Sequence, residues 1–106
     1  MAFKWPNKDP DEQLDYSIDW SRYLDTATIS SVVWKIDNAE GTKQTWTATT
    51  VVDGLQYVSA SNSSTVATIQ LGLGTANKNY NIYCQITTSA GVTTERKISL
   101  KVRENT

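Results

Sequence analysis

The chain contains no histidine, and this absence removes the side chain that most often serves as a general base or as a metal ligand. A Ser-His-Asp or Cys-His arrangement therefore cannot form. Serine and threonine hydroxyls are numerous, but the sequence pairs none of them with a base. We expect no enzymatic activity, no catalytic residues and no cofactor.

Cysteine is nearly absent as well, because Cys84 is the single one in 106 residues. One cysteine allows no disulfide within the chain, which fits folding in a reducing cytosol. Cys84 falls on the apolar side of an alternating segment, where a free cysteine behaves as a small hydrophobic residue. We therefore expect its thiol to be buried and unreactive.

The sequence also lacks long apolar runs and an excess of charge of one sign. No segment is apolar for long enough to form a signal peptide or to cross a membrane. The 10 basic and 11 acidic residues give a net charge of −1, so no strong field steers the chain to nucleic acid or anionic lipid. We expect neither a nucleic acid nor a membrane as partner, and the length predicts one domain.

What the sequence does contain is a repeated alternation of apolar and polar residues. Residues 80–87 and 97–103 alternate with period two on either side of a glycine-containing turn at 89–91, which predicts an antiparallel hairpin. Asp53-Gly54 predicts a second hairpin turn, and 21–27 is expected to be a loop. The same reasoning predicts five further strands, at 14–20, 29–36, 44–52, 55–60 and 65–71.

These strands predict the fold class. The Tyr-x-Ile-x-Cys pattern from Tyr80 to Cys84, with Trp34 about fifty residues before Cys84, is typical of an immunoglobulin-like sandwich. We predict an all-β, immunoglobulin-like β-sandwich of about seven antiparallel strands over residues 14–104. Its predicted core includes Trp20, Trp34, Trp46, Cys84, Ile86 and Ile98.

Residues 1–13 differ from the rest of the chain. Two prolines and dense charge disfavour both a central strand and a helix, so we predict an extended N-terminal arm. Aromatic residues on such an arm suit insertion into a pocket of a partner, and the alternative is that the arm packs on its own core. The candidate partner-binding residues are Phe3, Trp5, Pro6, Asp9, Asp11 and Glu12.

Two other motifs invite a ligand-binding interpretation. Gly72-Leu73-Gly74 lies between two strands rather than before a helix, so we interpret it as a turn and not as a phosphate loop. The acidic residues lack the central glycine and the spacing of a calcium loop, and we interpret them as a solvated strand face with turn caps. We therefore expect no metal site at Asp9, Asp11, Glu12, Asp15 and Asp19.

Several short motifs follow one another along nearly the whole chain. They are Lys8-Asp9-Pro10-Asp11-Glu12, Leu14-Asp15-Tyr16, Asp19-Trp20-Ser21, Gly74-Thr75-Ala76 before Tyr80, Ile86-Thr87-Thr88-Ser89-Ala90-Gly91, Thr94-Glu95-Arg96 and Ile98-x-Leu100-x-Val102. In this order of motifs the sequence resembles a family of small bacteriophage structural proteins, described as fiber–tail adaptor or conserved virion proteins. Residues 37–64 carry little of the resemblance, and Asn77-Lys78-Asn79 departs from the Gly-Thr that is usual there.

The resemblance implies a non-enzymatic virion component with an immunoglobulin-like domain. It also implies that the protein folds and assembles in the bacterial host cytoplasm, binds other phage virion proteins, and is present in multiple copies in a symmetric particle. The function that it implies is an adaptor or connector between tail or neck components and fiber components.

Two alternatives stay open. A capsid decoration (cement) protein would have the same size and composition. A carbohydrate- or cell-surface-binding module belongs to another class, and it would need three coplanar exposed aromatic side chains, with Tyr57 and Tyr83 as candidates.

Overall fold

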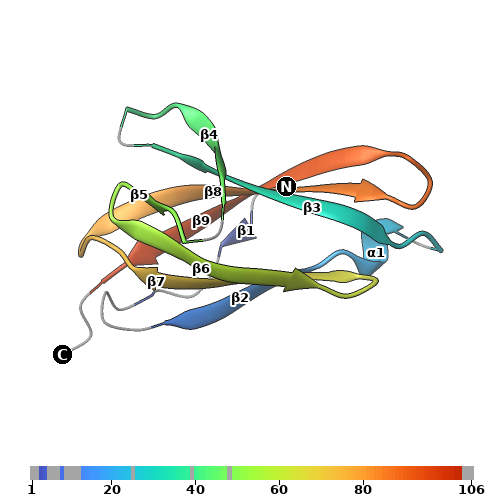
Figure 1. The fold of residues 1–106 in the computed structure, drawn as a ribbon, viewed down its shortest axis with the longest axis horizontal. Helices are drawn as coiled ribbons and strands as arrows, with labels where there is room; N and C mark the ends of the chain where they lie inside the picture. Colours follow the sequence, from blue (N-terminus) through green and yellow to red (C-terminus); the bar gives the residue numbers. More distant parts are fainter. Residues whose placement is uncertain are drawn as a thin grey trace.

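The computed structural model describes residues 3–4, 8, 13–24, 26–38, 40–47 and 49–103. Within these ranges the chain forms nine strands and one short helix, and the strands make two stacked sheets (Figure 1). The predicted all-β sandwich is therefore confirmed. Two of the nine strands, β1 and β5, have 2 residues each.

One sheet, called sheet A, has the order β1-β9-β8-β3-β4. Its strands are β1 (Phe3–Lys4), β9 (Thr93–Val102), β8 (Lys78–Thr88), β3 (Ile29–Asp37) and β4 (Lys43–Trp46). Sheet B has the order β2-β7-β6-β5. Its strands are β2 (Leu14–Asp19), β7 (Val66–Leu73), β6 (Leu55–Asn62) and β5 (Val51–Val52). Neighbouring strands are antiparallel, except that β1 runs parallel to β9.

The core lies between the two sheets and is built from the inward residues of each alternation. Along β8 every second residue is buried, and β9 continues the pattern from Ile98 onward. The six predicted core residues all lie in this core, each with at most 2% of its surface exposed: Trp20, Trp34, Trp46, Cys84, Ile86 and Ile98. The predicted hairpin at Asp53-Gly54 is also present, since Val52 pairs with Leu55 across it.

The single strand predicted over 44–52 is wrong, because the chain turns in its middle. β4 ends at Trp46 and β5 begins at Val51. Thr49 has a φ of 68°, and the Thr50 N–H donates to the Thr47 carbonyl over 3.1 Å. The Trp46 indole N–H donates to the Thr50 carbonyl, also over 3.1 Å. This local hydrogen bond from a side chain to the backbone stabilises a turn that the strand propensity of a threonine-rich segment does not reveal.

The loop predicted over 21–27 contains a single-turn helix, α1 (Ser21–Leu24). The Ser21 N–H donates to Asp19 Oδ1 over 2.9 Å, so Asp19 caps the start of the helix. This hydrogen bond holds the pKa of the Asp19 carboxyl below its usual value. The buried side chain of Leu24 then fixes α1 to the core.

Cys84 provides a direct test of the inward register of β8. Burial raises the pKa of its thiol to about 12, and the Trp20 side chain opposes this shift only in part. The thiolate, which is the reactive form of cysteine, is therefore scarce at pH 8 in the native protein. We expect native protein to resist an aromatic disulfide reagent, while protein unfolded in urea reacts at once with one thiol. Rapid stoichiometric labelling of the native protein would contradict the buried register.

Candidate interaction surfaces

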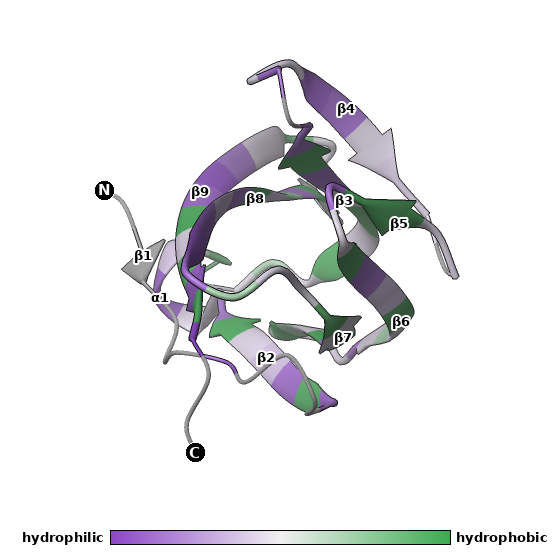
Figure 2. Cartoon of the chain, turned by 90° about the vertical axis from the view of Figure 1, so that its left-hand side faces the viewer, coloured by the Kyte–Doolittle hydropathy of each residue, from purple (hydrophilic) through white to green (hydrophobic). Residues whose placement is uncertain are grey.

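The described part of the N-terminal arm lies along the outer edge of β9. Phe3 and Lys4 pair with Ile98 and Ser99 of β9, which lies next to β8 in sheet A (Figure 2). Five residues after Phe3, the Lys8 N–H donates to the Lys101 carbonyl over 3.0 Å. The alternating charged residues over 97–103 are typical of an edge strand. In the structure, however, β9 has a neighbour on both sides, because it pairs with β8 and with the N-terminal strand β1.

The Lys8 side chain links this N-terminal segment to sheet B. Its side chain is fully buried, and its Nζ donates to the Leu73 carbonyl over 2.6 Å. A buried ammonium group is tolerated only where hydrogen bonds replace water, so this contact fixes the base of the arm to the end of β7. Sequence analysis did not single out Lys8, since a lysine within a charged motif predicts a solvated side chain.

The candidate arm residues are placed only in part. The backbone of Phe3 belongs to β1. Trp5, Pro6, Asp9, Asp11 and Glu12 lie outside the described residues. Their role in partner binding therefore stays a prediction, and so does the boundary between the arm over 1–13 and the domain over 14–104.

One end of the sandwich carries a partly apolar surface, which we call the hairpin-end patch. It joins α1 and the loop that follows it to the turn between β8 and β9, which lie together in Figure 1. Tyr23 and Val92 are its exposed large apolar residues, with 43% and 49% of their surfaces accessible. The residues that line it are Tyr23, Leu24, Ala27, Thr88, Ala90 and Val92.

Aromatic and cationic contacts hold the exposed ring of this patch. Tyr23 packs edge-to-face on the buried ring of Trp20, with 5.9 Å between the ring centroids. The Arg96 guanidinium lies 5.3 Å from the centroids of both rings. Such cation–π contacts hold the exposed tyrosine ring in a fixed position. Sequence reasoning missed this patch because two segments far apart in the chain contribute to it, and neither is distinctive alone.

The opposite end of the sandwich, the turn end, is fixed by polar contacts. The Tyr80 hydroxyl accepts the Thr75 N–H and donates to the Asp53 carbonyl, with 2.9 Å in each hydrogen bond. Asp53 also pairs with Lys78. Gly54 has a φ of +90°, and a Cβ there would lie 2.6 Å from Thr75 Oγ1. The two turns therefore interlock and form a fixed end rather than independent loops.

Gly72-Leu73-Gly74 lies at this turn end, and the interpretation of the whole motif as a turn is wrong. Gly72 and Leu73 complete β7, and the turn starts at Gly74. Gly72 is buried, and a Cβ there would meet the side chains of Val58, Gln56 and Gln13 within 3.4 Å. Its role in the structure is close packing within sheet B.

The outer face of sheet A carries a charged network. Glu95 lies between Lys35 and Lys43, with N–O distances of 3.6 and 2.8 Å. The Lys43 ammonium sits 4.5 Å from the ring centroid of Tyr83, whose hydroxyl donates to Asp37 over 3.1 Å. Partial burial, together with this carboxylate, raises the pKa of Tyr83. Tyr83 is thus engaged on both its face and its hydroxyl.

Tyr57, the other tyrosine considered for a sugar platform, lies in sheet B. Its ring packs edge-to-face on Trp46, with 5.5 Å between centroids and 85° between planes. Burial raises the pKa of its hydroxyl. Tyr57 and Tyr83 therefore lie on different sheets and do not share one plane.

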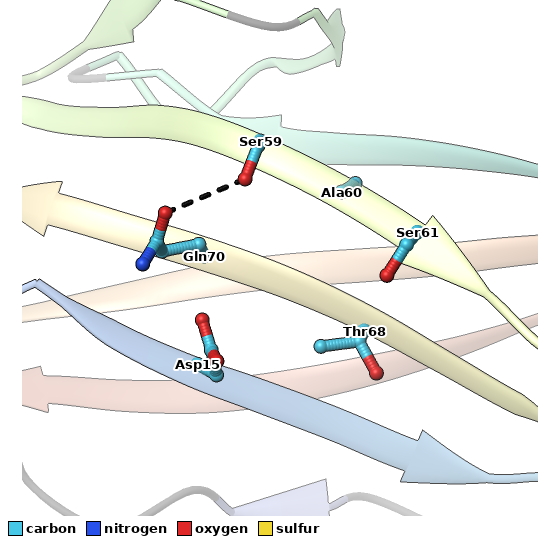
Figure 3. Close-up of a pocket in the computed structure, with 6 residues that line it drawn as sticks. All are labelled: Asp15, Ser59, Ala60, Ser61, Thr68 and Gln70. Atoms are coloured by element: carbon cyan, nitrogen blue, oxygen red, sulfur yellow. Dashed lines mark hydrogen bonds between the residues drawn. The ribbon is translucent and has the colours of Figure 1, made fainter.

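The outer face of sheet B is polar and built from short side chains. Figure 3 shows a shallow pocket across β6, β7 and β2, lined by Asp15, Ser59, Ala60, Ser61, Thr68 and Gln70. The Ser59 hydroxyl lies 3.4 Å from Gln70 Oε1, to which it donates. Asp15 and Asp19 are exposed on β2. Among the side chains that the structure describes, no three His, Cys, Asp or Glu residues gather into a group able to hold a metal ion.

Comparison with models of known protein families gives a match. The model of the family described as "Podophage GP4 fiber-tail adaptor protein gp77" matches residues 8–101. The matched range begins at Lys8, includes every strand from β2 to β8, and ends one residue before the end of β9. No curated protein matches the chain. Within the described ranges, no helix has the length and apolar character needed to cross a membrane.

Proposed function

Because the chain belongs to the podophage fiber-tail adaptor family, we propose that it joins tail or neck components of the virion to fiber components. The family match over residues 8–101 carries this proposal, since it takes in almost the whole sandwich. Membership of the family supports a structural role among phage tail proteins. The connector role adds that two different partners are bound at the same time.

The shape of the domain suits such a role. The described residues extend over 43 Å along the longest axis and over 27 and 26 Å along the other two. The hairpin-end patch and the turn end lie at opposite ends of the sandwich (Figure 1). Because its core is closely packed, the domain would hold two partners at a fixed distance and orientation.

In this proposal two separate regions bind the two partners. The hairpin-end patch offers the exposed ring of Tyr23 beside Val92, a combination that suits a contact with another protein. The N-terminal arm offers Phe3 and Trp5 as aromatic anchors, with the acidic residues Asp9 to Glu12 at its base. The arm runs along β9, away from the hairpin-end patch, so that each partner has its own surface.

Cryo-electron microscopy of the intact virion tests this proposal. We expect density that fits the two-sheet domain between the tail and the fibers, in several symmetry-related copies. Density on the capsid surface would instead identify a decoration protein. Absence of the chain from purified particles, measured by quantitative mass spectrometry, would overturn any structural role.

A further inference from the structure

The outer edge of β6 is paired only at Leu55, Gln56 and Tyr57 of its 8 residues. β5 pairs with its first two residues, since Val52 lies opposite Leu55 and Val51 opposite Gln56. The backbone of Thr49 and Thr50 then bonds to Tyr57, over 2.7 and 3.1 Å. Beyond Tyr57, no strand of the described sheets lies next to β6 on this side. Residues 58–62 therefore form an open edge.

The backbone of this open edge points outward at two residues. The Ser63 N–H donates to the Val66 carbonyl over 2.9 Å, so the backbone groups of Ser63 face β7. In an antiparallel ladder the direction alternates, which turns the N–H and C=O of Asn62 and Ala60 away from β7. A bulge between Tyr57 and Ser59 accounts for the change of parity along the strand. No hydrogen bond to these outward groups is formed by any described residue.

The other long edges of the two sheets carry charges that hinder pairing. β2, at the far edge of sheet B, presents Asp15 and Asp19, and β4, at the edge of sheet A, presents Lys43. Charged residues and prolines are the devices by which natural sheets prevent uncontrolled strand addition. The open edge of β6 is Val58-Ser59-Ala60-Ser61-Asn62, which contains neither.

The inner side of the same edge is uncovered. Ala60 pairs with Ile69 and Asn62 with Ala67, so each shares the core-facing side of sheet B. Ile69 and Ala67 are fully buried, whereas Ala60 and Asn62 are exposed. Nearer to β5, the contact between Trp46 and Tyr57 closes this side of the sandwich. Over residues 58–62, no described residue covers the core-facing side of β6 in the same way.

We propose that an extended segment of another virion protein adds to this edge as a further strand of sheet B. Its backbone would pair with the outward groups of Ala60 and Asn62. Its side chains would alternate, with apolar ones beside Ala60 and Asn62 and polar ones beside Ser59 and Ser61. The added strand would continue the row that β5 begins. This inference rests on the proposed function, because that function places the partner in the virion.

A second copy of this chain fits the edge less well than a different protein does. Pairing of β6 with β6 would bring only the Ala60 and Asn62 side chains of the second copy to the uncovered inner side. Filling that side requires apolar side chains, which are the main source of stabilisation on burial. The occupant is therefore an alternating apolar–polar strand from a different protein.

A proline at residue 60 tests the proposal within the assembled phage. Ala60→Pro removes the outward N–H, and proline is tolerated on an edge strand where that N–H faces solvent. We expect the melting temperature to stay within a few degrees and the copy number in purified virions to fall about tenfold or more. The matched control, Ala60→Ser, keeps the N–H and should incorporate like the unmodified chain. Incorporation of Ala60→Pro at the normal copy number would overturn strand addition.

A photo-crosslinking amino acid in place of Asn62 identifies the occupant in virions. We expect adducts with alternate residues of one short segment of a different virion protein. Adducts with a second copy of this chain, or no adduct, would overturn the proposal. Should Ala60→Pro unfold the domain, the cross-link decides alone. The two hypotheses have different failures. Absence of the unmodified chain from the tail would refute the connector role. Normal incorporation of Ala60→Pro would refute strand addition and leave the connector role intact.

Discussion

Replacement of Trp34 by alanine should lower the free energy of unfolding by about 3–5 kcal/mol. Trp34 is 2% exposed and lies in the middle of β3, opposite Cys84 on one neighbouring strand and Trp46 on the other. Removing the indole leaves a cavity between the sheets that three rigid strands cannot close. Since a small domain has only about 5–15 kcal/mol of stability in total, the variant should be close to unfolding at 37 °C.

Urea unfolding followed by circular dichroism measures this effect without relying on tryptophan fluorescence. Val33→Ala is the matched control, because Val33 is the next residue along β3 and 39% of its surface is exposed. We expect a change of at most about 0.5 kcal/mol there. If Trp34→Ala lowers the free energy of unfolding by less than about 1 kcal/mol and leaves the m-value for urea unchanged, the indole is not packed between the sheets.

The two-sheet core could be predicted from the sequence because the alternation of apolar and polar residues within each strand identifies its buried face. In β8 the alternation from Tyr80 to Ile86 needs no knowledge of other strands, and the structure buries those alternate residues. Trp20, Trp34 and Trp46 likewise fall on inward positions of their own segments or directly after them. Local periodicity therefore sufficed for the fold class and for most of the core.

Features that depend on distant partners were not accessible in this way. The turn after Trp46 is held by β6, because the Thr49 N–H donates to the Tyr57 carbonyl over 2.7 Å. The pairing of Phe3 with Ile98 joins residues almost a chain length apart, and two residues are too few to show a period. Lys8 illustrates the same point, because only the fold brings the Leu73 carbonyl to its ammonium group.

The interaction surfaces were hidden from sequence for a related reason. The hairpin-end patch joins two short segments that lie far apart in the chain, and neither has a distinctive sequence pattern. The open edge of β6 depends on where β5 stops, which strand propensity over 44–52 does not indicate. A surface that exists only through the ends of neighbouring strands leaves no local pattern.

Deletion of residues 1–7 should leave the sandwich folded and abolish incorporation of the chain into particles. β1 contributes pairing at only 2 residues, and Lys8, which ties the base of the arm to Leu73, is retained. Burial of one large aromatic side chain in a partner contributes about 1.5–3 kcal/mol by area alone, and the deletion removes both Phe3 and Trp5. The loss of two anchors exceeds what a connector with a modest interface can tolerate.

The measurement is paired: a melting curve of the truncated protein, and its copy number in purified virions by quantitative mass spectrometry. A double variant, Phe3→Ser with Trp5→Ser, is the matched control, because it keeps the backbone that pairs with β9 and removes only the anchors. We expect it to assemble as poorly as the truncation. If truncation unfolds the domain, the arm is part of the core, and the boundary placed after residue 13 is wrong. If incorporation is unchanged, the partner contacts lie elsewhere, with the hairpin-end patch as the next surface to alter.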